Sequence, residues 1–274
     1  MRISFIGGGV MAEAIIGGII ESQIAEAEAV SVGEPVKSRR EHLEAKYGVR
    51  ASASNVDALE GAELSVLAVK PQSLPYVMAE LKGKLARDNA VLSIVAGATT
   101  RTLVDGLGHE AVIRVMPNTP AQIGAGMSVW TAAASPANAA SPAVPKDRVE
   151  ATRRILATLG EEHYADDEKL IDMATALSAS GPAYVFLFIE ALIDAGVYLG
   201  MARDVARKLT LQTVLGSTQL VKDTGRHPAE LKDMVTSPGG TTIEALRAFE
   251  GSGFRASVFS AVIAAYEKSK TLGG

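Results

Sequence analysis

The chain has 274 residues, 47% of them hydrophobic and 21% charged, enough to bury a full core in one large or two modest domains. Its formal net charge of −4 argues against nucleic acid as a partner. The sequence contains no cysteine, which excludes disulfides, thiolate nucleophiles and thiolate metal sites.

The first part of the chain alternates between strand and helix patterns. Strands are expected at 3–7, 29–35, 63–71, 90–97, 111–120, 124–132 and 160–166, and helices at 11–22, 36–47, 73–85 and 146–159. Strands that alternate with helices predict a doubly wound, mostly parallel α/β sheet of the Rossmann type. The Ala/Ser/Pro-rich stretch 131–145 lacks periodicity and is expected to be a mobile surface loop.

From Asp166 onward the pattern is helical only, which predicts a domain boundary close to residue 165. Helices are expected near 167–179, 182–199, 203–223, 228–235, 241–250 and 254–270. Residues 183–200 are apolar enough to suggest a membrane span, but Glu190 and Asp194 fall in the middle, where a charge in lipid is costly. This helix is expected to be buried between subunits or at the centre of a domain. No export signal is recognised near Met1, so we expect a cytoplasmic protein that does not contact a membrane.

A glycine cluster follows the first expected strand. Gly7, Gly9 and Ala12 match the pattern G-x-G-x-x-A in a strand–turn–helix setting. In this pattern the glycines allow a tight turn and a close approach of the backbone to a pyrophosphate, which lies at the helix N-terminus. The cluster therefore predicts a dinucleotide site, and the alternative is a tight turn without a ligand.

Residues at the end of the second expected strand favour two different cofactors. Glu34 is placed to accept hydrogen bonds from the ribose hydroxyls of NAD, whereas Lys37, Arg39 and Arg40 could neutralise the 2′-phosphate of NADP. The basic residues could equally form a solvated helix face. The choice between NADH and NADPH stays open at this point.

A second glycine cluster, SPGGTT, covers Ser237 to Thr242 ahead of a helix. Thr241 and Glu244 fit a capping box, with Thr241 as the N-cap and Gly251 just past the helix end. A capping box does not explain the Pro-Gly-Gly approach or the hydroxyl of Thr242. A helix N-terminus reached through two glycines suits a carboxylate or phosphate, so we expect the substrate to bind here.

Other kinds of catalytic site find no support in the sequence. The four histidines are not at metal-ligand spacing, there is no G-x-S-x-G motif, and no metal is expected. Glu190 and Asp194 are interpreted as a polar stripe on a helix. Hydride transfer remains the favoured chemistry, since it mainly requires two bound molecules to be aligned.

The chain resembles pyrroline-5-carboxylate reductase over essentially its whole length. The resemblance rests on FIGGGVMAEAI, LAVKPQ, VIRVMPNTP, LSASGPAYVF and, most specifically, LKDMVTSPGGTTIEAL. It implies the reduction of L-1-pyrroline-5-carboxylate to L-proline by NADPH or NADH, the last step of proline biosynthesis. It also implies that residues 1–165 bind the dinucleotide, and that residues 166–274 bind substrate and form a homodimer, which could assemble further into a decamer.

The resemblance also carries residue roles. Residues implied to line the cofactor are Ile6, Gly7, Gly8, Gly9, Val10, Met11, Glu34, Asn55, Ala68, Val69, Lys70, Pro71, Ile94, Val95 and Ala96. Residues implied to surround the substrate are Ser237, Gly240, Thr241 and Thr242, with Thr242 near the ring nitrogen or the carboxylate as the catalytic residue.

Two other functions are compatible with a nucleotide domain followed by helices. A 3-hydroxyacid dehydrogenase would need a catalytic lysine in the early helical region, and residues 170–204 contain no lysine. A dinucleotide sensor without enzymatic activity would not need the pocket at Ser237 to Thr242.

Overall fold

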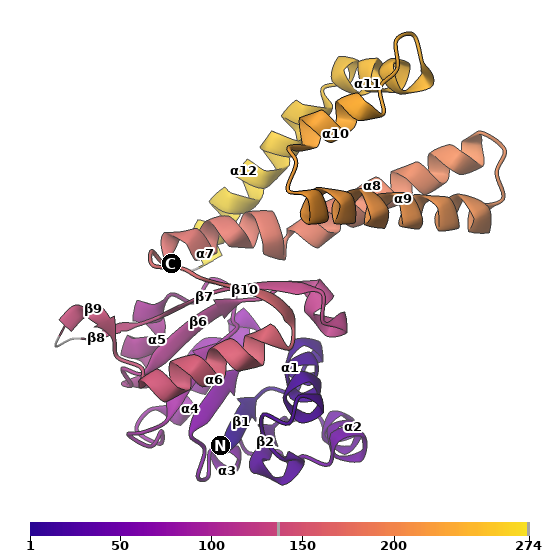
Figure 1. Ribbon diagram of the computed structural model, residues 1–274. Coiled ribbons are helices and arrows are strands. Elements are labelled where there is room, and N and C mark those ends of the chain that lie inside the picture. The colour runs from indigo at the N-terminus through magenta and orange to yellow at the C-terminus, as the bar shows by residue number, and fades with distance from the viewer. Residues whose placement is uncertain (136–137, 273–274) are drawn as a thin grey trace. The chain divides into compact units, whose positions relative to one another are not determined.

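The computed structural model describes residues 1–135 and 138–272 (Figure 1). The chain forms two compact units, which are described separately. The sheet unit comprises residues 1–180 together with the chain from 265 onward, and the helical unit comprises residues 181–264.

The sheet unit is built on an eight-stranded sheet in the order β10-β7-β6-β5-β4-β1-β2-β3. Its strands are β1 (Ile3–Ile6), β2 (Val30–Gly33), β3 (Arg50–Ser52), β4 (Leu64–Leu67), β5 (Ala90–Ser93), β6 (Val112–Met116), β7 (Gly126–Ala132) and β10 (Gly160–Tyr164). Neighbouring strands run parallel except for β6 and β7. Strand β1 lies between β2 and β4, so the strand order reverses there, as the Rossmann-type prediction requires.

Helices cover both faces of this sheet. They are α1 (Val10–Glu21), α2 (Lys37–Tyr47), α3 (Asn55–Ala58), α4 (Leu74–Leu81), α5 (Thr100–Leu107) and α6 (Lys146–Ala157). Side chains of α1, α2 and α6, among them Ile15, Leu43 and Ile155, share one core with Phe5 of β1. Side chains of α4 and α5 share a second core with Ile6, which points to the opposite face because side chains alternate along a strand.

The later helices are α7 (Lys169–Ala174), a π-helical turn (Thr175–Ala179), α8 (Gly181–Tyr198), α9 (Arg203–Thr224), α10 (Pro228–Met234), α11 (Thr241–Gly251) and α12 (Phe254–Leu272). The α-helices α7 to α12 each begin within two residues of a predicted start, and the π-helical turn falls inside the predicted helix 167–179. Helices α8 and α9 pack closely, since a Cβ on Gly196 would lie 2.9 Å from Ala206.

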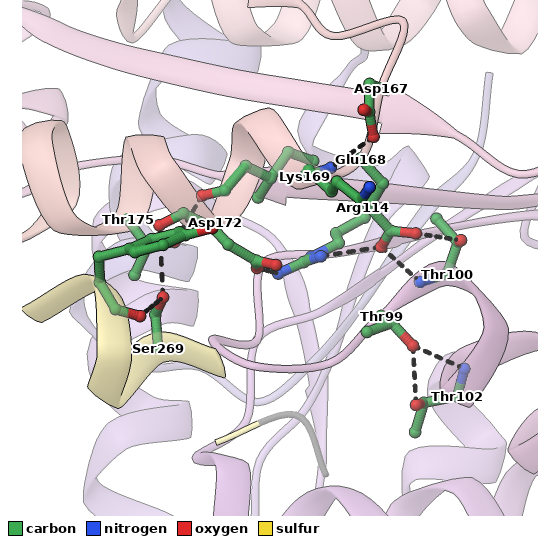
Figure 2. A network of polar contacts seen from close by, with 12 residues as sticks. Thr99, Thr100, Thr102, Arg114, Asp167, Glu168, Lys169, Asp172, Thr175 and Ser269 are labelled. Carbon is green, nitrogen blue, oxygen red and sulfur yellow. Dashed lines mark hydrogen bonds and ion pairs between the residues drawn. The ribbon is translucent and has the colours of Figure 1, made fainter. Parts of the chain in front are cut away.

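The compact units divide at Ser180, later than the predicted boundary near residue 165, because α7 packs on the sheet. Ile171 is buried against Val129 and Ala165. The buried guanidinium of Arg114 donates to Glu168 at 2.8 Å and to Asp172 at 2.7 Å (Figure 2). The sheet and helix α7 are therefore joined by apolar contacts, through Val129 of β7, and by ionic contacts, through Arg114 of β6.

The stretch 131–145 also differs from the prediction. In place of an irregular loop it contains β8 (Ala134–Ser135) and β9 (Asn138–Pro142), which pair in antiparallel orientation, while residues 136–137 lie outside the described residues. Backbone hydrogen bonds can form such a pair without the alternating apolar side chains that sequence patterns detect.

Candidate active site

The glycine turn after β1 is held tightly against neighbouring strands. The N–H of Gly7 donates to the carbonyl of Gly33 at 2.8 Å. Gly7 has φ +96°, and a Cβ there would lie 2.7 Å from the carbonyl oxygen of Ala68. Any other residue would be strained and would clash, so this position requires glycine.

Both the N–H and the carbonyl oxygen of Gly8 are hydrogen-bonded to side chains. Its N–H donates to Glu34 Oε2 at 2.9 Å, and its carbonyl oxygen accepts a hydrogen bond from Arg39 Nε. A Cβ on Gly8 would approach Leu43 to 2.8 Å. Gly8 is therefore positioned by the protein itself, with its N–H already engaged.

Gly9 differs from Gly7 and Gly8, at which a Cβ would clash with neighbouring atoms. It is the N-cap of α1 with φ −67°, and its Cβ position has no neighbouring atom within 4 Å in the described chain. Within the part of the chain that the structure describes, no side chain caps the helix here, so the N–H groups of the first turn are open to an anion. The open space at Gly9 and the uncapped helix end fit the pyrophosphate of a dinucleotide.

Glu34 and the basic residues of α2 form an ordered group beside this turn. The Glu34 side chain is nearly buried, and its second oxygen accepts a hydrogen bond from the N–H of Val36 at 2.9 Å. Arg40 donates to the carbonyl oxygens of Glu34 and Pro35 at 2.8 and 2.9 Å. The group is thus a hydrogen-bonded cluster and only in part a solvated helix face.

Glu13, in the first turns of α1, binds several side chains of α2. It forms an ion pair with Arg39, and its Oε1 lies 3.0 Å from His42 Nε2 and 2.9 Å from Lys46 Nζ. Burial by itself raises the pKa of the Glu13 carboxyl, but the hydrogen bonds from His42, Lys46 and Arg39 outweigh it and lower that pKa to about 2. The carboxylate therefore holds Arg39 beside Gly8. The sequence patterns missed this role, since the contacts join residues on different helices.

The remaining residues of the predicted cofactor set lie at the same edge of the sheet. Ile6 pairs in register with Gly33 and with Leu67, and Leu67 pairs with Ser93, so the carboxyl ends of four strands coincide. Ala68, Val69, Lys70 and Pro71 follow β4, and Ile94, Val95 and Ala96 follow β5. Asn55 packs against Gly33 and donates to Glu80 at 2.8 Å. The sheet unit thus brings the predicted cofactor residues together.

The predicted substrate residues lie together in the helical unit. The N–H of Gly240 donates to the carbonyl of Ser237 at 3.1 Å and closes a turn. Pro238 is the second residue of this turn and Gly239 is the third. Gly239 has φ +64°, which this turn position favours in glycine. The Ser237 hydroxyl lies against Gly240, where a Cβ would clash with it.

The predicted capping box at this helix is wrong. Gly240, and not Thr241, is the N-cap of α11, and Gly251 is the last helical residue. Glu244 is 3.1 Å from Arg247 and pairs with it, as residues three apart on a helix surface do, instead of turning back to the N-terminus. No side chain in the described chain caps α11, so its first N–H groups stay open to an anion, beside the half-buried Thr242.

Three of the four histidines have structural partners. His42 binds Glu13, His109 lies 2.6 Å from the carbonyl oxygen of Asn89, and the imidazole of His227 accepts the N–H of Ala229 at the start of α10. Among residues 1–135 and 138–272 no cluster of acidic or histidine side chains could hold a metal ion.

Comparison with known proteins agrees with this arrangement. Residues 168–272 match the family model for pyrroline-5-carboxylate reductase dimerisation, and residues 2–97 match that for NADP oxidoreductase, coenzyme F420-dependent. The chain is 45% identical to a pyrroline-5-carboxylate reductase of Synechocystis, with 100% of this chain and 98% of the relative aligned. It belongs to the pyrroline-5-carboxylate reductase family.

Solved structures of the family have the same fold. A pyrroline-5-carboxylate reductase from Coxiella burnetii superposes with a TM-score of 0.87 at 34% identity, covering 100% of this chain and 98% of that one. The enzyme from Plasmodium falciparum, solved with NADP bound, superposes with a TM-score of 0.88 at 33% identity and the same coverage. The resemblance found in the sequence is confirmed.

The dimerisation match accounts for the apolar surface of the helical unit. Lys169–Tyr198 is long and apolar enough to cross a membrane by length and composition, and an 18-residue window within it has a mean hydropathy of 1.6. However, Asp194 within it forms an ion pair with Arg203 at 2.7 Å. None of the α8 side chains is buried within the described chain, and a groove of about 530 Å³ lies between apolar side chains of α8, α11 and α12. In a dimerisation domain a second subunit covers such a surface.

Proposed function

We propose that this protein reduces L-1-pyrroline-5-carboxylate to L-proline with NADPH or NADH, the last step of proline biosynthesis. The observation that carries the proposal is a family relationship extending over 100% of the chain at 45% identity, so it includes both the glycine turn and the Ser237–Thr242 turn. In this proposal the carboxyl edge of the sheet would bind the cofactor and the turn before α11 would bind the substrate.

The cofactor would be held at the carboxyl edge of the sheet. Residues Ile6 to Met11 would approach the pyrophosphate, with Gly9 leaving room and the first turn of α1 offering its N–H groups. Glu34 and Asn55 would lie toward the adenosine ribose, and the residues after β4 and β5 would line the remaining length. When bound, the cofactor supplies a hydride.

The substrate offers one carboxylate and one cyclic imine for recognition. The uncapped N-terminus of α11 and the hydroxyls of Ser237 and Thr241 would bind the carboxylate. Thr242 would stand near the ring nitrogen and orient it. Reduction adds a hydride to C5 and a proton to nitrogen, so the C=N bond becomes a secondary amine.

This reaction needs little help from acid or base side chains. A protonated iminium is already a strong electrophile, so no histidine acid is required. The residues of both turns act by binding, orientation and exclusion of water, which is how proteins assist cofactor-based hydride transfer.

The assembly proposed is a homodimer formed through the C-terminal helices, able to assemble further into a decamer. The exposed apolar side chains of α8 and α12, such as Leu187 and Phe259, support the dimer. We further propose that the protein works in the cytoplasm.

The test is the oxidation of NADH and of NADPH, measured in parallel with and without pyrroline-5-carboxylate on the purified protein. Imine-dependent oxidation with formation of proline is expected. A folded sample that binds the cofactor but oxidises neither form would refute the reductase and favour a dinucleotide sensor. Oxidation of the cofactor by a 3-oxoacid in place of the imine would favour a hydroxyacid dehydrogenase.

A further inference from the structure

NADH and NADPH differ at the adenosine ribose, which in this fold lies near the end of β2. NADPH carries a phosphate where NADH has a free 2′-hydroxyl; an acidic side chain accepts a hydrogen bond from the hydroxyl, whereas a cation accommodates the phosphate. We propose that Glu34 makes this chain select NADH over NADPH. The proposal rests on the proposed function of the same site and adds its cofactor preference.

The carboxylate of Glu34 is fixed in place. One oxygen accepts the N–H of Gly8 and the other accepts the N–H of Val36, both at 2.9 Å. The residue is only 9% exposed, and turning its side chain away would break both hydrogen bonds. Each carboxylate oxygen can accept a further bond, so the group still has capacity for a ribose hydroxyl.

The nearby cations are already engaged. Arg39 donates to the carbonyl of Gly8 and forms an ion pair with Glu13, while Arg40 donates to the carbonyls of Glu34 and Pro35. Lys37 is 80% exposed and lies 3.6 Å from Glu41. A 2′-phosphate that bound Arg39 would compete with Glu13 and with the glycine turn.

The fixed carboxylate of Glu34 therefore favours the hydroxyl at this strand end. A phosphate placed beside a carboxylate that cannot rotate away is repelled, and the repulsion is stronger near a protein surface than in bulk water. A ribose hydroxyl gains a hydrogen bond to the same carboxylate. We expect a dissociation constant for NADH at least about tenfold below that for NADPH, a difference that one charged contact can supply.

The experiment is a titration of the intact protein with NADH and with NADPH, followed by nicotinamide fluorescence in the absence of imine. Glu34→Gln is expected to remove most of the NADH preference. The matched control is Glu21→Gln, which removes the same charge from the exposed far end of α1 and should keep the wild-type ratio. Equal or tighter binding of NADPH by the wild type overturns the proposal, and so does a Glu34→Gln ratio equal to that of the wild type.

A second variant tests the proposed preference if Glu34→Gln binds neither cofactor. Glu13→Gln releases Arg39 while Glu34 stays in place, and should therefore shift the ratio of dissociation constants toward NADPH. An unchanged ratio overturns the proposal. Because these titrations contain no imine, failure of imine reduction would count against the proposed function and would leave the measured preference intact.

Discussion

The guanidinium of Arg114 on β6 donates to the carboxylate of Glu168 at 2.8 Å, and the same carboxylate accepts the N–H and the hydroxyl of Thr100 at 2.8 and 2.7 Å (Figure 2). One carboxylate thus joins the sheet, the start of α5 and the start of α7. Asp172 completes the pairing of the arginine and accepts a hydrogen bond through its carbonyl from Ser269 at 3.3 Å.

Arg114→Ala should therefore destabilise the sheet unit strongly. The Arg114 side chain is 4% exposed, and its removal leaves two carboxylates facing each other without a cation. Such a loss costs about 3 kcal/mol of unfolding free energy. Urea denaturation measures it, and Arg101→Ala, which removes an 89% exposed arginine, should change the value by less than about 0.5 kcal/mol. Equal effects of the two variants would contradict this prediction.

Glu13→Gln should change how the free energy of unfolding depends on pH. The ordinary pKa of 4.5 is lowered to about 2 in the folded protein, so the carboxylate stabilises the fold above pH 4.5 and loses this effect as the pH falls toward 2. The variant should be less stable than the wild type at pH 7, with a difference that shrinks between pH 4.5 and 2. Unfolding free energies measured across this range check it, and a difference independent of pH would contradict it.

Replacing Gly7 or Gly9 by alanine should have different effects, on stability in the first case and on cofactor affinity in the second. Gly7→Ala forces a side chain onto a positive φ and against Ala68, so it should cost more than about 1 kcal/mol of stability. Gly9→Ala meets no protein atom and should melt like the wild type, while its methyl group occupies the space proposed for the pyrophosphate. We expect its cofactor affinity to fall about tenfold, or 1.4 kcal/mol, in a fluorescence titration. Wild-type affinity of Gly9→Ala would place the pyrophosphate elsewhere.

The sequence predicted the parts of the fold that carry strong apolar patterns. Strands such as β1 and β4 are buried on both faces and appear as short, mostly apolar runs, and α8 to α12 are bounded by Gly and Pro. Strand β3 and helix α3 were missed, because three or four residues with few apolar side chains give no periodic signal.

The candidate site was predictable where local chemistry decides it. The glycine turn has a fixed spacing that reflects backbone geometry, and its residues lie where the pattern indicated. The contacts of Glu13 with α2 and of Arg114 with α7 join segments far apart in the chain, so no local pattern could reveal them. The Thr241 cap failed for a different, local reason, since Gly240 is the N-cap and Glu244 pairs with Arg247 on the same helix.

Thr242→Ala should lower turnover without unfolding the protein. The side chain is half-buried beside the open N-terminus of α11, and losing one hydrogen bond to a charged substrate should reduce kcat/KM for the imine about tenfold. Thr242→Ser keeps the hydroxyl and should restore most of the activity. The matched control is Thr218→Ala, because the Thr218 hydroxyl is exposed and donates to the Val214 carbonyl within α9. Unchanged steady-state kinetics of Thr242→Ala would refute its role.

Leu187→Glu should prevent dimer formation through the helical unit. Leu187 is 67% exposed on α8 and lines the apolar groove, so in a dimer the new carboxylate would be buried without a partner. Light scattering after size exclusion should show the dimer changing to monomer. Tyr76→Glu introduces the same charge on α4 of the sheet unit, at a side chain 80% exposed, and should remain dimeric. If Leu187→Glu stays dimeric while Tyr76→Glu dissociates, the subunit interface lies on the sheet unit and the apolar groove needs another occupant.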